Sequence, residues 1–153
     1  MEEATLLLEG DLANFAVKIK DLNKYGCGDA LWFVEFQADN LNATFTTTTT
    51  LYLNNKKPEF VKQLQSDQFL IHIIKSDVIT TVLSSILLGE DDFELDLSSE
   101  YPDDSLGKIV SDWLSSLNVK KESDLQNIRY QLINDQGNFR SRCQNLASIK
   151  EEE

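Results

Sequence analysis

The order of hydrophobic and polar residues predicts a strand-rich first half of the chain. Phe15, Val17 and Ile19 alternate with small or charged residues, which is the period-two pattern of a half-buried strand. Residues 30–36 (ALWFVEF) are apolar on both alternating faces, so we expect an interior strand that is covered on both sides. Residues 43–53 are β-branched or aromatic at almost every position, which favours a third strand.

The middle of the chain extends this expectation. Pro58 stands where the first turn of a helix tolerates proline, so a short helix is expected over about 57–66. Residues 69–74 form a continuous apolar run of strand length. Residues 78–88 fit either a helix or a strand, and their β-branched content favours a strand. Residues 93–97 alternate cleanly, as in a strand with one face in water.

The period becomes helical in the last third. Apolar residues at i, i+3, i+4, i+7, i+8 and i+11 from Leu106 follow a capping candidate, Ser105, and predict a helix over 105–118. Residues 127–133 alternate again and predict another strand. Phe139 and the apolar residues that follow it at helical spacing predict a final helix.

These elements predict an α+β layer fold, with helices on one side of a mostly antiparallel sheet. We expect about six strands and two or three helices in a single domain over residues 1–153, because the length suits one core.

Composition and charge narrow the functional classes. The chain has 14 Lys plus Arg against 26 Asp plus Glu, for a net charge of −12. Such a chain repels phosphate groups, so we expect no nucleic-acid partner and no membrane, and a basic protein surface is the better partner. No window looks apolar enough for a membrane span, and the apolar run at residues 6–8 is too short for a signal peptide. We therefore expect a location in the cytoplasm, with the nucleus as a second location.

No catalytic set stands out in the sequence. His72, the only histidine, lies inside the apolar run and is typical of a hydrogen-bonded core or strand-face histidine. Cys27 stands between two glycines, but only Lys24 is close enough in sequence to lower its pKa, which favours an inert thiol. The sequence contains no Cys-x-x-Cys, Gly-x-Ser-x-Gly or phosphate-loop motif. We expect no enzymatic activity, no cofactor and no metal.

The most acidic segment is the best test of that expectation. Residues 90–104 contain eight carboxylates and no basic residue. Residues 92–96 match the first three ligand positions of a calcium loop, but Leu97 and Asp103 stand where glycine and glutamate are required. Solvated carboxylates on a strand explain the pattern better than a metal site.

Three stretches are similar to the small proteasome assembly chaperones, and within that family to the fourth mammalian-type chaperone and its fungal counterparts. Residues 14–19 (NFAVKI) and 29–34 (DALWFV) resemble the family's opening strand pair, with its Asn-Phe start and aromatic second strand. Residues 84–91 (SSILLGED) resemble the Ser/Thr-x-Leu-Leu-Gly-acidic turn before its long helix. The third stretch comprises the helix 105–118, the strand 127–133 and a last helix that opens at Asn138 and Phe139. Relative to the compact family pattern the chain has additional residues, so the resemblance implies surface insertions at about 40–67 and 92–104.

The resemblance implies a non-enzymatic chaperone of core-particle assembly. It would form a heterodimer with a related small chaperone subunit, bind an α-type proteasome subunit during α-ring formation, and leave before maturation. The charge of −12 is compatible with docking on a basic patch, where complementary charge mainly raises the association rate and specificity. The partner-binding residues expected on this basis are Phe33, Leu87, Leu88, Gly89, Glu90, Asp91 and Phe139.

Several alternatives stay open. One is an acidic bacterial immunity or inhibitor protein that blocks a basic active site. Others are an enzyme and a β-sandwich head with a helical tail, as in end-joining scaffolds, although the strand at 127–133 weighs against the latter. The apolar runs at 30–36 and 78–88 carry more hydrophobic surface than one helical layer covers, which leaves some for a sister subunit. The same surface is equally consistent with a core beneath the helix at 57–66.

Overall fold

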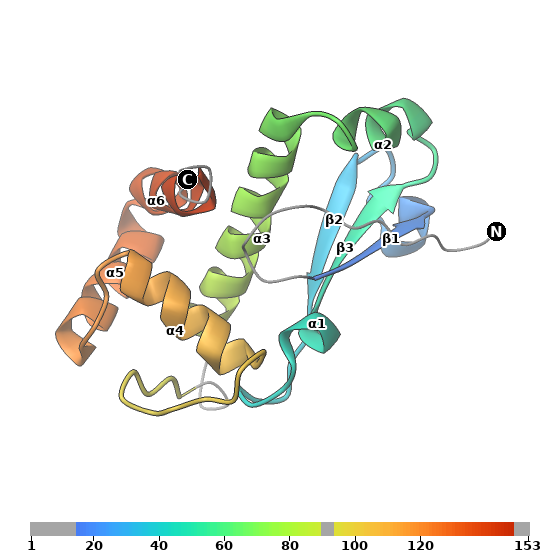
Figure 1. Ribbon diagram of the computed structural model, residues 1–153. Helices are drawn as coiled ribbons and strands as arrows, with labels where there is room; N and C mark the ends of the chain where they lie inside the picture. Colours follow the sequence, from blue (N-terminus) through green and yellow to red (C-terminus); the bar gives the residue numbers. More distant parts are fainter. Residues whose placement is uncertain (1–14, 90–93, 149–153) are drawn as a thin grey trace.

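A small sheet and a group of helices lie on either side of one long central helix (Figure 1). This computed structural model describes residues 15–89 and 94–148. The elements in chain order are β1 (Ala16–Lys20), the 3-10 helix η1 (Leu22–Tyr25), β2 (Trp32–Phe36), α1 (Phe45–Thr48), β3 (Thr49–Asn54), α2 (Pro58–Leu64), α3 (Gln68–Leu88), α4 (Leu106–Ser116), α5 (Glu122–Asn134) and α6 (Gln136–Ser148).

The sheet has three strands in the order β1-β3-β2, with β1 parallel and β2 antiparallel to the central β3. Val17 and Val34 both pair with Leu51, so one register runs across all three strands. Val17, Leu51 and Leu53 are buried on the face that points to the helices. The segment expected as a surface insertion at 40–67 therefore supplies the central strand.

The central helix α3 replaces two of the expected strands, at 69–74 and 78–88. Asp67 caps its first turn by accepting hydrogen bonds from the backbone N–H groups of Phe69 and Leu70. No glycine or proline interrupts the chain before Gly89, so the helix continues through the β-branched run. The expectation that no window is apolar enough for a membrane span is wrong for α3, which by length and composition alone could cross a membrane. Half of its apolar 18-residue window is nevertheless buried inside this fold.

The expected strand at 127–133 is also wrong, because these residues belong to α5. Leu125, Ile128 and Leu132 are buried at i, i+3 and i+7, which is the spacing of one helical face. The Asp124 carboxylate accepts hydrogen bonds from the N–H groups at the helix start and so favours a helix over a strand. The alternation that suggested a strand depended on Tyr130, whose side chain is exposed.

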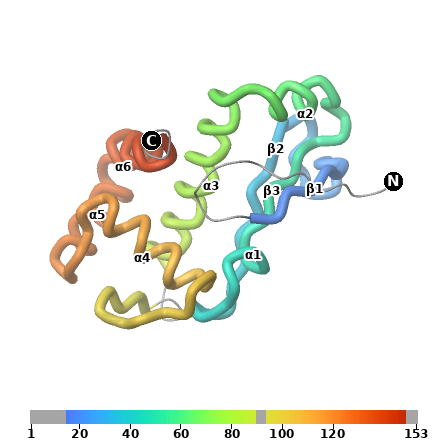
Figure 2. The backbone as a smooth tube through the Cα atoms, in the orientation of Figure 1, coloured from blue at the N-terminus to red at the C-terminus, as the bar shows by residue number. Residues whose placement is uncertain are grey.

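The expected sheet of about six mostly antiparallel strands is therefore wrong, although the α+β class is retained. The described residues contain six α-helices and one mixed three-stranded sheet. Residues 94–97 are not a strand but belong to an irregular segment that leads into α4 (Figure 2). The helices expected at 57–66, at 105–118 and after Asn138 are confirmed as α2, α4 and α6. The strand expected at 30–36 exists as β2, but at a sheet edge and with only half-buried residues.

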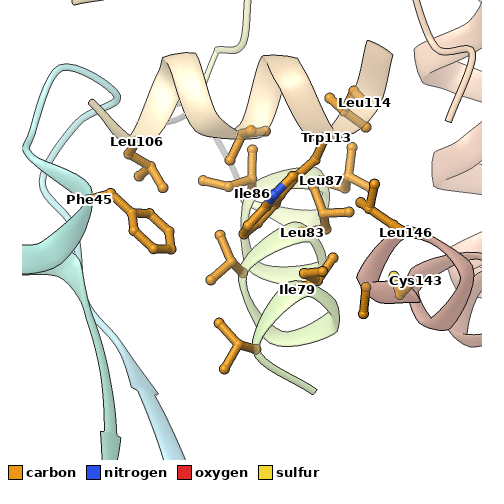
Figure 3. Close-up of a cluster of buried hydrophobic side chains, with 14 of the residues drawn as sticks. Phe45, Ile79, Leu83, Ile86, Leu87, Leu106, Trp113, Leu114, Cys143 and Leu146 are labelled. Atoms are coloured by element: carbon orange, nitrogen blue, oxygen red, sulfur yellow. The ribbon is translucent and has the colours of Figure 1, made fainter. Parts of the chain in front are cut away.

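Part of the hydrophobic core lies where α1, α3, α4 and α6 meet (Figure 3). Phe45 from α1 meets Trp113 from α4 edge to face, with ring centroids 5.8 Å apart. Ile86 and Leu87 from the last turns of α3 lie beneath α4. The apolar run at 78–88 is thus mainly core, although the covering helices are α4 and α6 rather than the expected helix at 57–66.

Candidate functional site

The expected partner-binding residues do not lie together on one surface. Leu87 and Phe139 are buried in the core, so neither side chain is available to a partner. Leu88 is 53% exposed and Gly89 is half-buried at the end of α3. The remaining pair, Glu90 and Asp91, lies outside the described residues.

Phe33 lies on the face of the sheet that points away from the central helix, within an aromatic cluster. Its ring stacks on Tyr52 at 5.9 Å and lies 5.4 Å from Tyr25. The Tyr52 hydroxyl donates a 3.0 Å hydrogen bond to Glu35, and the Lys20 ammonium lies 5.3 Å from the Tyr52 ring centroid. Burial first, and then the hydrogen bond to Glu35, raise the pKa of Tyr52 to about 12. Phe33 is therefore part of a self-contained cluster rather than a projecting anchor.

A more exposed apolar surface lies at the junction of α3 and α5. The Arg129 guanidinium donates a 2.9 Å hydrogen bond to the Leu87 carbonyl oxygen, which ties α5 to the last turn of α3. Next to these two residues in the chain are Leu88 (53% exposed) and Tyr130 (66% exposed). Ile133, one turn further along α5, is 61% exposed. We call Leu88, Tyr130 and Ile133 the α3–α5 patch.

Carboxylates surround the same arginine. A cleft of about 340 Å³ is lined by Arg129 together with Glu94, Asp96 and Glu122. Hydrogen bonds from the side chain and backbone N–H of Ser98 lower the pKa of Asp96, which therefore stays ionised at neutral pH. Arg129 borders both the cleft and the bond to α3, so it links these carboxylates to the Leu88 end of the α3–α5 patch.

A second apolar surface lies where α2 and α3 meet. Phe69 is 81% exposed and Ile73, one turn later on α3, is 52% exposed. Trp32 stacks on Phe60 of α2 at 5.8 Å, and its indole N–H donates a 2.8 Å hydrogen bond to Asp77, one further turn along α3. Sequence reasoning missed both exposed residues because it placed them in a buried strand.

A third feature is a polar groove of about 570 Å³ between the end of α4 and α6. Arg142 holds its wall together by donating hydrogen bonds to the Gln131 side chain at 2.8 Å and to the Leu117 carbonyl at 2.7 Å. Most other lining residues are exposed asparagines and serines. The groove contains no pairing of a nucleophile with a base.

The reactive groups of the described residues are dispersed. Within residues 15–89 and 94–148, no group of three His, Cys, Asp or Glu residues is placed to hold a metal ion. His72 lies half-buried on α3 rather than in a strand. Cys27 is half-buried, and burial raises the pKa of the Cys143 thiol in the core. Part of the segment tested as a calcium loop lies outside the described residues.

Comparison with known proteins places the chain in no family. No family model, curated protein sequence or solved structure matches it.

Proposed function

We propose that the protein is not an enzyme and acts by binding another protein through the α3–α5 patch. The observation that carries this proposal is the exposure of Leu88, Tyr130 and Ile133, each more than half in water, around one junction. Isolated exposed apolar residues need no explanation, but a group of them with a polar margin has the composition of an interface core and rim.

The patch can supply only part of the binding free energy. Burying the exposed parts of three such side chains contributes about 3–5 kcal/mol. Association costs about 4–15 kcal/mol in lost translational and rotational freedom, so the margin and further contacts must contribute as well. Tyr130 is the best anchor, because aromatic residues dominate the energetics of protein interfaces.

The charge distribution indicates the chemistry of the partner. Glu94, Asp96 and Glu122 line the cleft beside the patch, and the whole chain has a net charge of −12. A partner with an apolar residue surrounded by lysine or arginine suits this surface. The association rate should then fall as salt is raised, because screening weakens electrostatic steering.

The resemblance to proteasome assembly chaperones gives the proposal a specific form, with a sister chaperone and an α-type proteasome subunit as partners. The acidic charge and the exposed end of the Leu-Leu-Gly stretch support it. The strand that it implied at 127–133 is a helix, and β3 separates β1 from β2. The identity of these two partners therefore rests on the sequence resemblance and stays a prediction.

The acidic cleft favours one second candidate, an inhibitor of a basic active site. Glu94, Asp96 and Glu122 could receive basic side chains of an enzyme. The two candidates differ in their partners, which are a basic enzyme in one case and assembly subunits in the other.

Affinity purification from the source cells, followed by mass spectrometry, tests the proposal. Three baits are compared: the unchanged chain, Tyr130→Asp, and Asn127→Asp as a control that adds the same charge to an exposed position on the same helix. We expect a partner that the unchanged chain and the control retain and that Tyr130→Asp loses. A set of partners that is identical for all three baits would refute the α3–α5 patch as the interface.

A further inference from the structure

In the part of the chain that the structure describes, no other strand pairs with the outer edge of β2. The hydrogen bonds from Asn54 N–H to the Leu31 carbonyl (3.1 Å) and from Gln37 N–H to the Thr48 carbonyl (2.9 Å) mark two hydrogen-bonded pairs of the β2–β3 ladder. Such pairs alternate along an antiparallel ladder, so residues 33 and 35 also bond to β3. The backbone groups of residues 32 and 34 therefore point the other way, toward the edge.

These edge groups lack protein partners in the described part of the chain. Among residues 15–89 and 94–148, no hydrogen bond joins the backbone N–H or C=O of Trp32 or Val34 to another group at this edge. Both residues are half-buried rather than buried. The Trp32 side chain points to the helices, where it contacts Phe60 and Asp77. The outward backbone groups of β2 lie in the plane of the sheet, so they point at a right angle to the Trp32 side chain.

The two edges of the sheet differ in how they are protected. Sheet edges in proteins that do not pair are usually blunted by lysines, prolines or bulges. β1 carries Lys18 and Lys20. β2 (WFVEF) has neither lysine nor proline, and its register with β3 runs through five consecutive pairs without a bulge. The edge of β2 therefore carries neither lysine, proline nor bulge against strand pairing, and its one charged residue, Glu35, accepts a hydrogen bond from the Tyr52 hydroxyl.

We propose that β2 accepts an added strand, an extended segment of another protein that pairs with the backbone of Trp32 and Val34. Main-chain hydrogen bonds would supply the affinity, and alternate side chains the specificity. On the outer face the added strand would lie beside Phe33 and Glu35, which favours an apolar residue near a lysine. A second copy of the chain is disfavoured, because pairing would double a net charge of −12. This site is separate from the α3–α5 patch and does not depend on it.

Amide hydrogen exchange of the free protein tests whether the edge is open. We expect slow exchange at Phe33 and Glu35, whose N–H groups bond to β3, and fast exchange at Trp32 and Val34. Slow exchange at all four amides would show that the edge is already covered and would overturn the proposal.

A synthetic probe tests whether the edge binds a strand. The probe is a peptide of alternating valine and threonine with a lysine at each end, titrated into the isotopically labelled protein. We expect saturable shifts centred on Trp32 and Val34, with a Kd below about 1 mM. N-methylation of alternate peptide residues should weaken binding about tenfold, since it removes the N–H groups that would pair.

Protein variants complete the test. Val34→Pro removes an outward N–H but no bond to β3, and proline is tolerated at sheet edges, so binding should weaken about tenfold. Val34→Thr keeps the N–H and should bind normally, as should Tyr130→Asp, which alters only the other surface. Should Val34→Pro fail to fold, the N-methylated peptide still decides. No saturable binding, equal binding of both peptides, or a dimer of the unchanged chain that Val34→Pro abolishes would each overturn the proposal.

Discussion

The substitution Gly107→Ala sets helix propensity against packing. Gly107 is the second residue of α4, where alanine should stabilise a helix by up to about 1 kcal/mol. A Cβ atom at this position would lie 2.5, 2.6 and 2.8 Å from three atoms of the Tyr101 ring. Such distances are too short for carbon atoms, whose best separation is about 3.5–4.0 Å. Either the ring or the first turn of α4 must therefore move.

The expected magnitude follows from what the ring would lose. Tyr101 is half-buried against the core, and its hydroxyl accepts a 3.0 Å hydrogen bond from the Asp96 N–H. Overpacking costs about 1–3 kcal/mol, and a lost hydrogen bond costs about 1 kcal/mol. After the gain in propensity, Gly107→Ala should lower the free energy of unfolding by about 1–3 kcal/mol.

Denaturant unfolding measures this effect, and the chain offers a matched control. Gly137 is likewise the second residue of a helix, α6, and a Cβ atom there would meet nothing within 4 Å. Gly137→Ala should thus be neutral or stabilising by up to about 1 kcal/mol. In a Tyr101→Ala background the cost of Gly107→Ala should largely disappear. A Gly107→Ala variant as stable as the unchanged protein would contradict the clash with Tyr101.

Three further predictions concern the core, the sheet and the thiols. Trp113→Ala should cost about 3–5 kcal/mol in urea unfolding, and Tyr130→Ala less than about 0.5 kcal/mol, because the first side chain is buried and the second is exposed. Equal losses would contradict this assignment. The pKa of Tyr52 is raised from 10.0 in the unfolded chain to about 12 by burial and by its bond to a carboxylate. Its contribution to stability is therefore complete below pH 10 and is lost as the pH rises toward 12. Tyr52→Phe should flatten the fall in unfolding free energy over that range, and an unchanged profile would count against the assignment. Cys27 should react with a thiol reagent in the folded protein, whereas Cys143, buried and with a raised pKa, should react only as the chain unfolds. Two equally fast thiols would disprove this difference.

The sequence alone determined the elements that have one buried and one exposed face. The apolar stripe of α4 places Val110, Trp113 and Leu114 in the core. Its helical period was visible in the sequence because the opposite side of the helix is polar. β1 was visible for the same reason, since Val17 is buried while its neighbours in the strand are less so. Local pattern and tertiary environment agree in these segments, so local reasoning was sufficient.

Tertiary structure decided the segments that are covered on several sides. α3 packs against the sheet on one side and α6 on the other. Residues 69–74 are apolar at every position except His72, so the first turns of the helix show no helical period in the sequence. Residues 78–87 do place their buried residues at helical spacing, separated by pairs of threonines and serines, but their β-branched content favoured a strand. In α5 the exposed Tyr130 broke the helical pattern and imitated the alternation of a strand.

The candidate surfaces also depended on the tertiary structure. Leu87 and Leu88 are chemically identical neighbours, yet one is buried and the other exposed, because one residue turns a helix by about 100° and the packing of α4 and α5 decides which side is covered. The unpaired edge of β2 has the same origin. The strand order β1-β3-β2 comes from long-range pairing across residues 16–54, which no local pattern of side chains records.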